Sequence, residues 1–178
     1  MFARLFLVFA VLSLTACGSP YVNIPPLQGD SPAAHDPDGA SVAKVEAVAL
    51  KHLIVRDNPA DGYVVDLPAG TSKQTYAQVL DQLPVGAQTV GEGQSGLPHY
   101  EVAQVQVRGF SAQVDIIRPA SALGKQELVS VYVAVDMDGW YAQKTRVWRV
   151  PVDQALALAR AAPPVEEPAE EQAEQATE

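Results

Sequence analysis

The chain has 178 residues, of which 48% are hydrophobic and 19% are charged, and its formal net charge is -9. This composition is typical of a globular protein, so it excludes a chain that is disordered throughout, a collagen-like repeat and a multi-span membrane protein. The acidity lies mainly at the ends, because residues 42–162 contain 12 acids and 11 bases. A body with no positive excess argues against a nucleic-acid partner, which requires a clustered basic surface.

Residues 1–16 have the form of a secretory signal peptide, in which a basic residue precedes an apolar run over residues 5–14. The run is too short for a membrane-spanning helix, which needs about 20 apolar residues. It ends in Leu14-Thr15-Ala16-Cys17, which resembles the lipobox of bacterial lipoproteins and contains the only cysteine of the chain. Ordinary cleavage after Ala16 and a buried N-terminal helix are the alternatives, but neither accounts for the lone cysteine.

The resemblance implies that residues 1–16 are removed and that Cys17 carries a thioether-linked diacylglyceryl group, usually with a third acyl chain on its amino group. Two or three such chains hold a protein on a membrane almost permanently. Gly18 follows the cysteine, where the inner-membrane retention signal of the family has an aspartate. We therefore expect a lipid-anchored protein of the cell envelope, on the outer membrane facing the periplasm rather than on the inner membrane.

Composition divides the rest of the chain into three parts. Residues 17–41 are predicted to be the lipidated cysteine and a tether rich in Pro and Gly, which would hold the domain some tens of Å from the membrane at about 3.1 Å per residue. Residues 42–162 are predicted to form a single α+β domain. Residues 163–178 contain six Glu and no base, and are predicted to be an acidic disordered tail.

The first half of the domain is predicted to contain two helices. Apolar residues at spacings of three and four predict a helix over residues 42–54, capped by Ser41. A short strand over residues 63–67 follows a loop. Thr71 or Ser72 then caps a second helix, which Pro84 ends.

Beyond Pro84 the hydrophobic period changes to two, which predicts strands. The clearest strand covers residues 127–136, and an Asp-Gly turn joins it to a returning strand over residues 140–150. Two alternating phases in residues 105–116 switch at Gly109, which marks either a bulge in one bent strand or the turn of a hairpin. Of the two we favour the bent strand. Residues 152–162 are predicted to be a short alanine-rich helix.

This order of elements predicts the α+β class, with two N-terminal helices packed on a curved antiparallel sheet and a short C-terminal helix. The order loosely resembles that of cystatin-like and NTF2-like folds, in which a bent sheet wraps a helix. The resemblance implies a fold in which the sheet can enclose a pocket, and it implies no activity.

No motif predicts a cofactor or a metal. Residues 91–96 satisfy G-x-G-x-x-G, but Pro98 and a strand follow where a dinucleotide site needs a helix. The acidic loop over residues 57–62 has Pro59 at the third ligand position of an EF-hand, and Pro68 stands at the twelfth; the loop over residues 136–139 has only two acids, so both are predicted to be turns. No catalytic residue is predicted either.

A candidate binding patch lies on the last strand, where Trp140, Lys144, Arg146 and Trp148 share one face if the strand alternates regularly. Aromatic faces beside cations suit sugar rings, acidic polymers or another protein. The alternative is that the tryptophans pack at the edge of the core while the basic side chains are solvated and protect an edge strand from pairing.

These features favour a non-catalytic binding or scaffold module whose partner is an envelope protein or a glycan. A first alternative is a pocket for a small molecule or lipid, lined by Tyr100, Phe110, Val114 and Tyr132. A second is a hydrolase. It requires His99 or His52 to lie within hydrogen-bonding reach of both a nucleophile and a carboxylate.

Overall fold

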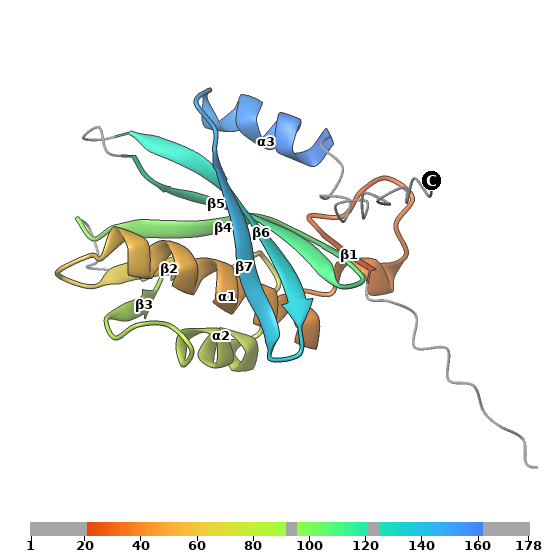
Figure 1. Ribbon diagram of the computed structural model, residues 1–178, viewed down its shortest axis with the longest axis horizontal. Coiled ribbons are helices and arrows are strands. Elements are labelled where there is room, and N and C mark those ends of the chain that lie inside the picture. Colours follow the sequence, from red (N-terminus) through yellow and green to blue (C-terminus); the bar gives the residue numbers. More distant parts are fainter. Residues whose placement is uncertain (1–20, 92–95, 121–124, 162–178) are drawn as a thin grey trace, which may run out of the picture.

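The computed structural model describes residues 21–91, 96–120 and 125–161, so the predicted signal peptide, Cys17 and the acidic tail lie outside the described residues. A seven-stranded sheet in the order β3-β2-β4-β5-β6-β7, with β1 also paired to β4, forms the centre of the molecule (Figure 1). The strands are β1 (Tyr21–Ile24), β2 (Tyr63–Asp66), β3 (Ala87–Thr89), β4 (His99–Arg108), β5 (Ser111–Pro119), β6 (Gln126–Asp136) and β7 (Gly139–Val147). The helices are η1 (Pro32–His35), α1 (Ala40–Asp57), α2 (Lys73–Leu80) and α3 (Val152–Ala161).

The α+β class is confirmed, and β4 to β7 form the expected antiparallel meander. Gly109 is the turn of a hairpin and not a bulge in one bent strand, because Arg108 of β4 pairs with Ser111 of β5. Its φ of 58° lies in the left-handed region that glycine adopts without strain. The bulge of this hairpin lies instead in β4, between Val102 and Gln104.

The sheet is mixed, because β2 runs parallel to both of its neighbours, β3 and β4. Helix α2 connects β2 to β3 as the crossover that a parallel pair requires. The long strand β4 has two short neighbours on the same edge, with β2 beside its first half and β1 beside its second half. A wholly antiparallel sheet was therefore a wrong expectation for this edge.

The region predicted to be a tether, residues 17–41, contains the strand β1. In β1, Val22 and Ile24 are buried in the main core, and Asn23 is buried on the opposite side. A strand of four residues with two apolar side chains has too few residues to show a period of two. Consequently at most residues 18–20 separate Cys17 from the folded domain, which is far less than the expected tether.

The two predicted N-terminal helices do not lie together on the sheet. A strand precedes α1, β2 separates α1 from α2, and α2 packs against α1 at the edge of the fold. Helix α1 starts at Ala40 and continues to Asp57, three residues beyond the predicted end, where Asn58 adopts a left-handed conformation. The Ser72 side chain caps α2 by accepting a hydrogen bond from the Thr75 N–H (3.2 Å), as predicted.

The two faces of the sheet differ in chemistry. The face under α1 is apolar, and its side chains form the main core with Val45, Leu50 and Leu53. The other face is covered in part by α3, whose Ala155 and Ala159 pack on a smaller cluster. On this second face the central strands contribute buried polar side chains, namely Gln104, Gln106, Gln113, Asp115 and Ser130.

Candidate binding surfaces

The structure divides the predicted patch on β7 between the two faces of the sheet. Tyr132 pairs with Lys144 and Val133 pairs with Ala142, so Gln143 is an extra residue that forms a β-bulge. The bulge shifts the alternation by one position. Trp140 therefore packs against the core on the α1 side, whereas Lys144 and Trp148 lie on the α3 side. The four predicted residues do not form one surface.

Trp148 is a buried structural residue. It is only 7% exposed and packs against Leu128 and α3. Its indole N–H donates to Ser130 Oγ (2.8 Å), and the Ser130 hydroxyl donates to Asp115. The guanidinium carbon of Arg146 lies 3.8 Å from the centre of the indole ring and covers it. A ring that is packed on one side and covered on the other is not available to stack on a sugar.

Asp115 ends this buried hydrogen-bond chain. The Gln113 amide donates to both of its carboxylate oxygens (3.1 Å each) and also to the carbonyl of Ala159 in α3 (3.4 Å). Burial raises the pKa of Asp115 to about 6, although the hydrogen bonds from Ser130 and Gln113 lower it. This chain of hydrogen bonds therefore connects β5, β6, α3 and Trp148, which follows β7, and its role is structural.

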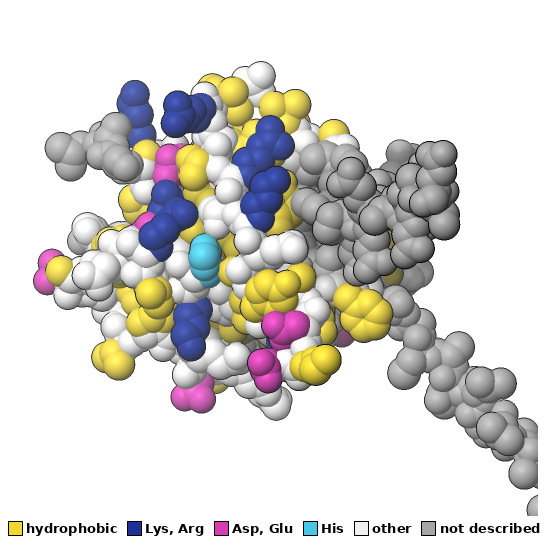
Figure 2. Space-filling view, in the orientation of Figure 1, with side chains coloured by type: hydrophobic (Ala, Val, Ile, Leu, Met, Phe, Trp, Pro, Cys, Tyr) yellow, Lys and Arg dark blue, Asp and Glu magenta, His cyan; other side chains and the backbone are white. Residues whose placement is uncertain are grey.

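The two cations of the patch, Lys144 and Arg146, are exposed on the α3 side of the edge strand β7, and further cations lie on α1, on the other side of this strand. The Nζ of Lys144 lies 5.7 Å from the centre of the Tyr132 ring, and α1 packs along β7, where His52 Nε2 lies 3.1 Å from Thr145 Oγ1. Figure 2 shows Lys and Arg side chains over α1 and β7, with a His between them. We call this the basic surface, and its exposed residues are Lys44, Lys51, Arg56, Lys144, Arg146 and Arg149.

The basic surface has few acidic partners. Within residues 21–91, 96–120 and 125–161, only Arg56 of its six cations forms an ion pair, at 3.7 Å from Asp57. The sequence pattern does not reveal the part on α1. Lys44 and Lys51 are seven residues apart and therefore lie on one face of a helix. That this helix lies beside β7 follows only from the packing of α1 on that strand in the structure.

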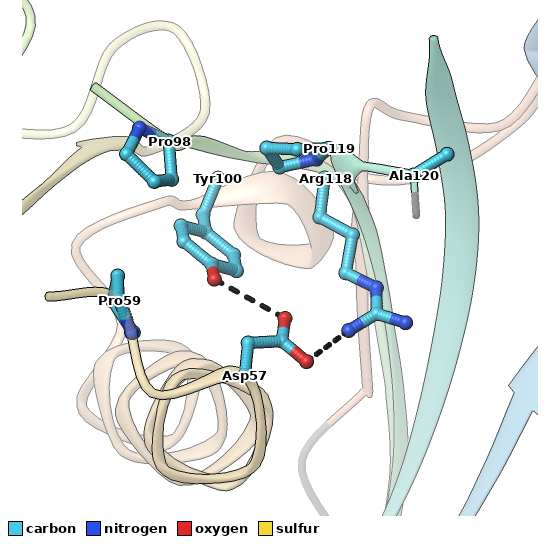
Figure 3. Close-up of a pocket in the computed structure, with 7 residues that line it drawn as sticks. All are labelled: Asp57, Pro59, Pro98, Tyr100, Arg118, Pro119 and Ala120. Atoms are coloured by element: carbon cyan, nitrogen blue, oxygen red, sulfur yellow. Dashed lines mark hydrogen bonds and ion pairs between the residues drawn. The ribbon is translucent and has the colours of Figure 1, made fainter. Parts of the chain in front are cut away.

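A cleft of about 300 Å³ lies at the end of α1 (Figure 3). Its walls are Pro59, Pro98, Pro119 and Ala120, and Asp57, Tyr100 and Arg118 supply its polar groups. The Tyr100 hydroxyl donates to Asp57 (3.1 Å), and Arg118 donates to Asp57 from one side. From its other side Arg118 donates to Glu127 through Nε and Nη2 (3.1 and 2.7 Å).

The polar groups of the cleft bind one another, which limits their chemistry. Burial lowers the pKa of Arg118, but the hydrogen bond to Asp57 and the charge of Asp57 outweigh this and raise it. Burial raises the pKa of the Tyr100 phenol, and the charge of Asp57 raises it further. Neither group exchanges a proton near neutral pH. The Arg118 guanidinium already donates hydrogen bonds to two carboxylates. The described residues that line the cleft therefore offer no free group that could bind an anion or act as an acid or base.

The requirements of the hydrolase alternative are not met in the part of the chain that the structure describes. His52 contacts a hydroxyl, that of Thr145, but no carboxylate. His99 lies near a carboxylate, with Nε2 at 3.9 Å from Asp66 Oδ2, but it contacts no nucleophile. The same residues contain no cluster of three or more His, Cys, Asp or Glu that could hold a metal ion. Most of the glycine loop, residues 92–95, lies outside the described residues.

The predicted pocket lining is wrong. Val114 is buried in the main core under α1, Tyr132 lies on the opposite face, and Phe110 is 71% exposed at the β4–β5 turn. Only Tyr100 of the four predicted residues lines the cleft. Alternation along a strand shows which residues share a face, but it does not show which faces enclose a cavity.

Among the described residues, no helix is long and apolar enough to cross a membrane. Comparison with protein-family models, with curated proteins and with solved structures finds no match to this chain. The loose resemblance to cystatin-like and NTF2-like folds rests on the predicted order of elements, and the structure keeps this order only in part.

Proposed function

We propose that the chain is a lipoprotein of the bacterial cell envelope, anchored through lipidated Cys17, whose folded domain is a non-catalytic binding module. The lipobox-like segment and the position of the only cysteine support the anchor and the removal of residues 1–16. Gly18 supports an outer-membrane location facing the periplasm. In this proposal the acidic tail over residues 163–178 is not part of the folded module.

The observation that carries the binding role is the basic surface. Five of its six cations lack an ion-pair partner among the described residues, although the body as a whole is near neutral. Cations without an ion-pair partner among the described residues favour an acidic partner, since complementary charge steers association and selects against wrong partners. Lys144 and Arg146 also lie on β7, the edge strand of the described sheet, and an edge strand can pair with another chain.

A protein partner fits this surface better than a glycan. The two tryptophans predicted to stack on a sugar are not available for this, because Arg146 covers Trp148 and Trp140 packs against the core. The exposed groups are cationic, and they match a protein surface rich in Asp and Glu. The cleft beside Tyr100 supports a small-molecule role less well, because its polar groups are already paired and its volume is at the lower end of ligand sites.

Site-specific photo-crosslinking in the native envelope tests the binding role. A photoreactive residue at Lys144 in the full chain should capture a defined protein with an acidic surface, and the adduct should be lost when Arg146→Glu is added. The matched control places the photoreactive residue at Lys73, an exposed position on α2. Capture of the same proteins from both positions, or no effect of Arg146→Glu, would count against the basic surface as the binding site.

A further inference from the structure

Three segments of the chain meet at one end of the sheet. Tyr21, the first residue of β1, pairs with Arg108 at the end of β4. The carbonyl of Phe110, in the β4–β5 turn, accepts a hydrogen bond from the Val135 N–H in β6 (2.9 Å). The β6–β7 turn, which contains Met137, follows directly. Figure 1 shows β1 and both turns at the same end of the sheet.

This end exposes large apolar side chains. Phe110 is 71% exposed and Met137 is fully exposed, although neither turn needs an apolar residue for its conformation. Behind them, Tyr21 and Tyr141 are about half-exposed and lie in one row across the second face, because Ala134 pairs with both Ser111 and Tyr141. We call Tyr21, Phe110, Met137 and Tyr141 the apolar tip. Figure 2 shows hydrophobic side chains at the surface here.

The lipid anchor is attached close to the apolar tip. Cys17 precedes Tyr21 by four residues, so their Cα atoms are separated by at most about 14 Å at 3.3–3.6 Å per residue. The opposite end of β4, at His99, lies about 30 Å further along the strand. The apolar tip is therefore the part of the sheet that a short anchor holds against the membrane.

We propose that the apolar tip docks on the bilayer that holds Cys17, with Phe110 and Met137 in the interface and the two tyrosines at the level of the headgroups. This inference rests on the proposed lipidation of Cys17. Tyrosine is enriched at membrane interfaces because it has an apolar ring and a polar end. The contact replaces the long tether expected from the sequence, and it leaves Arg146, near the end of β7, and Arg149, just beyond it, directed away from the membrane.

Charges near the apolar tip limit the depth of the contact. Asp136 and Asp138 lie in the β6–β7 turn and Asp30 lies beside Tyr21, and the guanidinium of Arg108 is stacked 4.0 Å from the Tyr21 ring centre. The Asp136 carboxylate accepts hydrogen bonds from the N–H groups of Asp138 and Gly139 (2.8 and 3.1 Å). This acidic excess does not attract anionic headgroups, so the surface fits a shallow contact with a phosphatidylethanolamine-rich membrane.

Fluorescence quenching by lipids tests the docking. Because Cys17 is acylated in the mature chain, a cysteine introduced at Phe110 or at Met137 is its only thiol and takes an environment-sensitive dye. The full lipidated chain is placed in vesicles of phosphatidylethanolamine and phosphatidylglycerol that carry spin-labelled acyl chains. The control is Val85→Cys, a fully exposed position in the α2–β3 turn, at the His99 end of the sheet.

Dyes at Phe110 and Met137 should shift to the blue and lose roughly half of their fluorescence to the quencher, while the dye at Val85 keeps its emission in water. If the chain is retained on the vesicles but all three dyes behave alike, the docking is wrong and the anchor stands. If the mass of the purified chain shows no lipid on Cys17, both the anchor and the docking are overturned. Circular dichroism of each variant confirms that the fold is kept.

Discussion

Glu46 should make the stability of the domain depend on pH. It lies in α1 and is fully buried, and neither carboxylate oxygen has a hydrogen-bond partner among the described residues. Burial raises its pKa from 4.5 to about 8, and the charge of Asp38 adds to this. The carboxyl group is therefore protonated in the fold at neutral pH, whereas in the unfolded chain it is ionised above about pH 4.5.

The sign and size of the effect follow from this difference. Because the folded pKa is raised, the stability is fully present below the unfolded pKa and is lost as the pH rises toward the folded pKa. Each pH unit between the two values lowers the unfolding free energy by up to about 1.4 kcal/mol. Between about pH 5 and about pH 7 the loss due to Glu46 is therefore about 2 kcal/mol.

Glu46→Gln isolates this contribution, because the amide has no proton to lose. Urea unfolding of both proteins is followed by tryptophan fluorescence, in a Cys17→Ser background so that neither carries lipid. Relative to its parent, the variant should gain about 2 kcal/mol between about pH 5 and about pH 7. Asp115, whose pKa is also raised, titrates in both proteins, and its effect cancels. A constant free-energy difference across this range would refute the reasoning.

Three further predictions concern stability, each measured by urea unfolding. Trp148→Phe replaces the indole with a smaller aromatic ring and removes the N–H that donates to Ser130, and should cost about 1–3 kcal/mol, whereas no loss would mean that the buried hydrogen-bond chain is unimportant. Arg118→Ala removes the cation that joins Asp57 and Glu127, leaves Asp57 with the Tyr100 hydroxyl and Arg56, and should cost about 2 kcal/mol, with Arg118→Lys intermediate. Gly62→Ala should cost more than Gly29→Ala, because both have φ near +90° but only at Gly62 does a Cβ meet a backbone oxygen, at 2.9 Å. Equal losses at the two glycines would contradict this.

The parts of the fold that the sequence predicted are those set by local pattern. The strand over residues 127–136, its Asp-Gly turn and the Ser72 cap depend on periodicity and on short-range chemistry, and all three are confirmed. The sequence around Gly109 is compatible with a turn and with a bulge. Only the pairing of its two flanking segments shows that it is a turn.

The parts that were missed depend on partners far away in the chain. The bulge at Gln143 is defined by the register with β6, so a regular alternation placed Trp140 on the wrong face. The strand β1 exists because β4, about eighty residues later, supplies its hydrogen bonds. The basic surface arises from the packing of α1 along β7, which periodicity within either element does not show.

The anchor at Cys17 is the central claim of this account, because the proposed location and the docking of the apolar tip both depend on it. Intact-mass spectrometry of the chain, extracted with detergent from the membranes of its own cells, tests it most directly. The account predicts a protein that begins at Cys17 and carries the added mass of a diacylglyceryl group, with or without a third acyl chain. A chain that retains residues 1–16, or one with an unmodified thiol at Cys17, would contradict it.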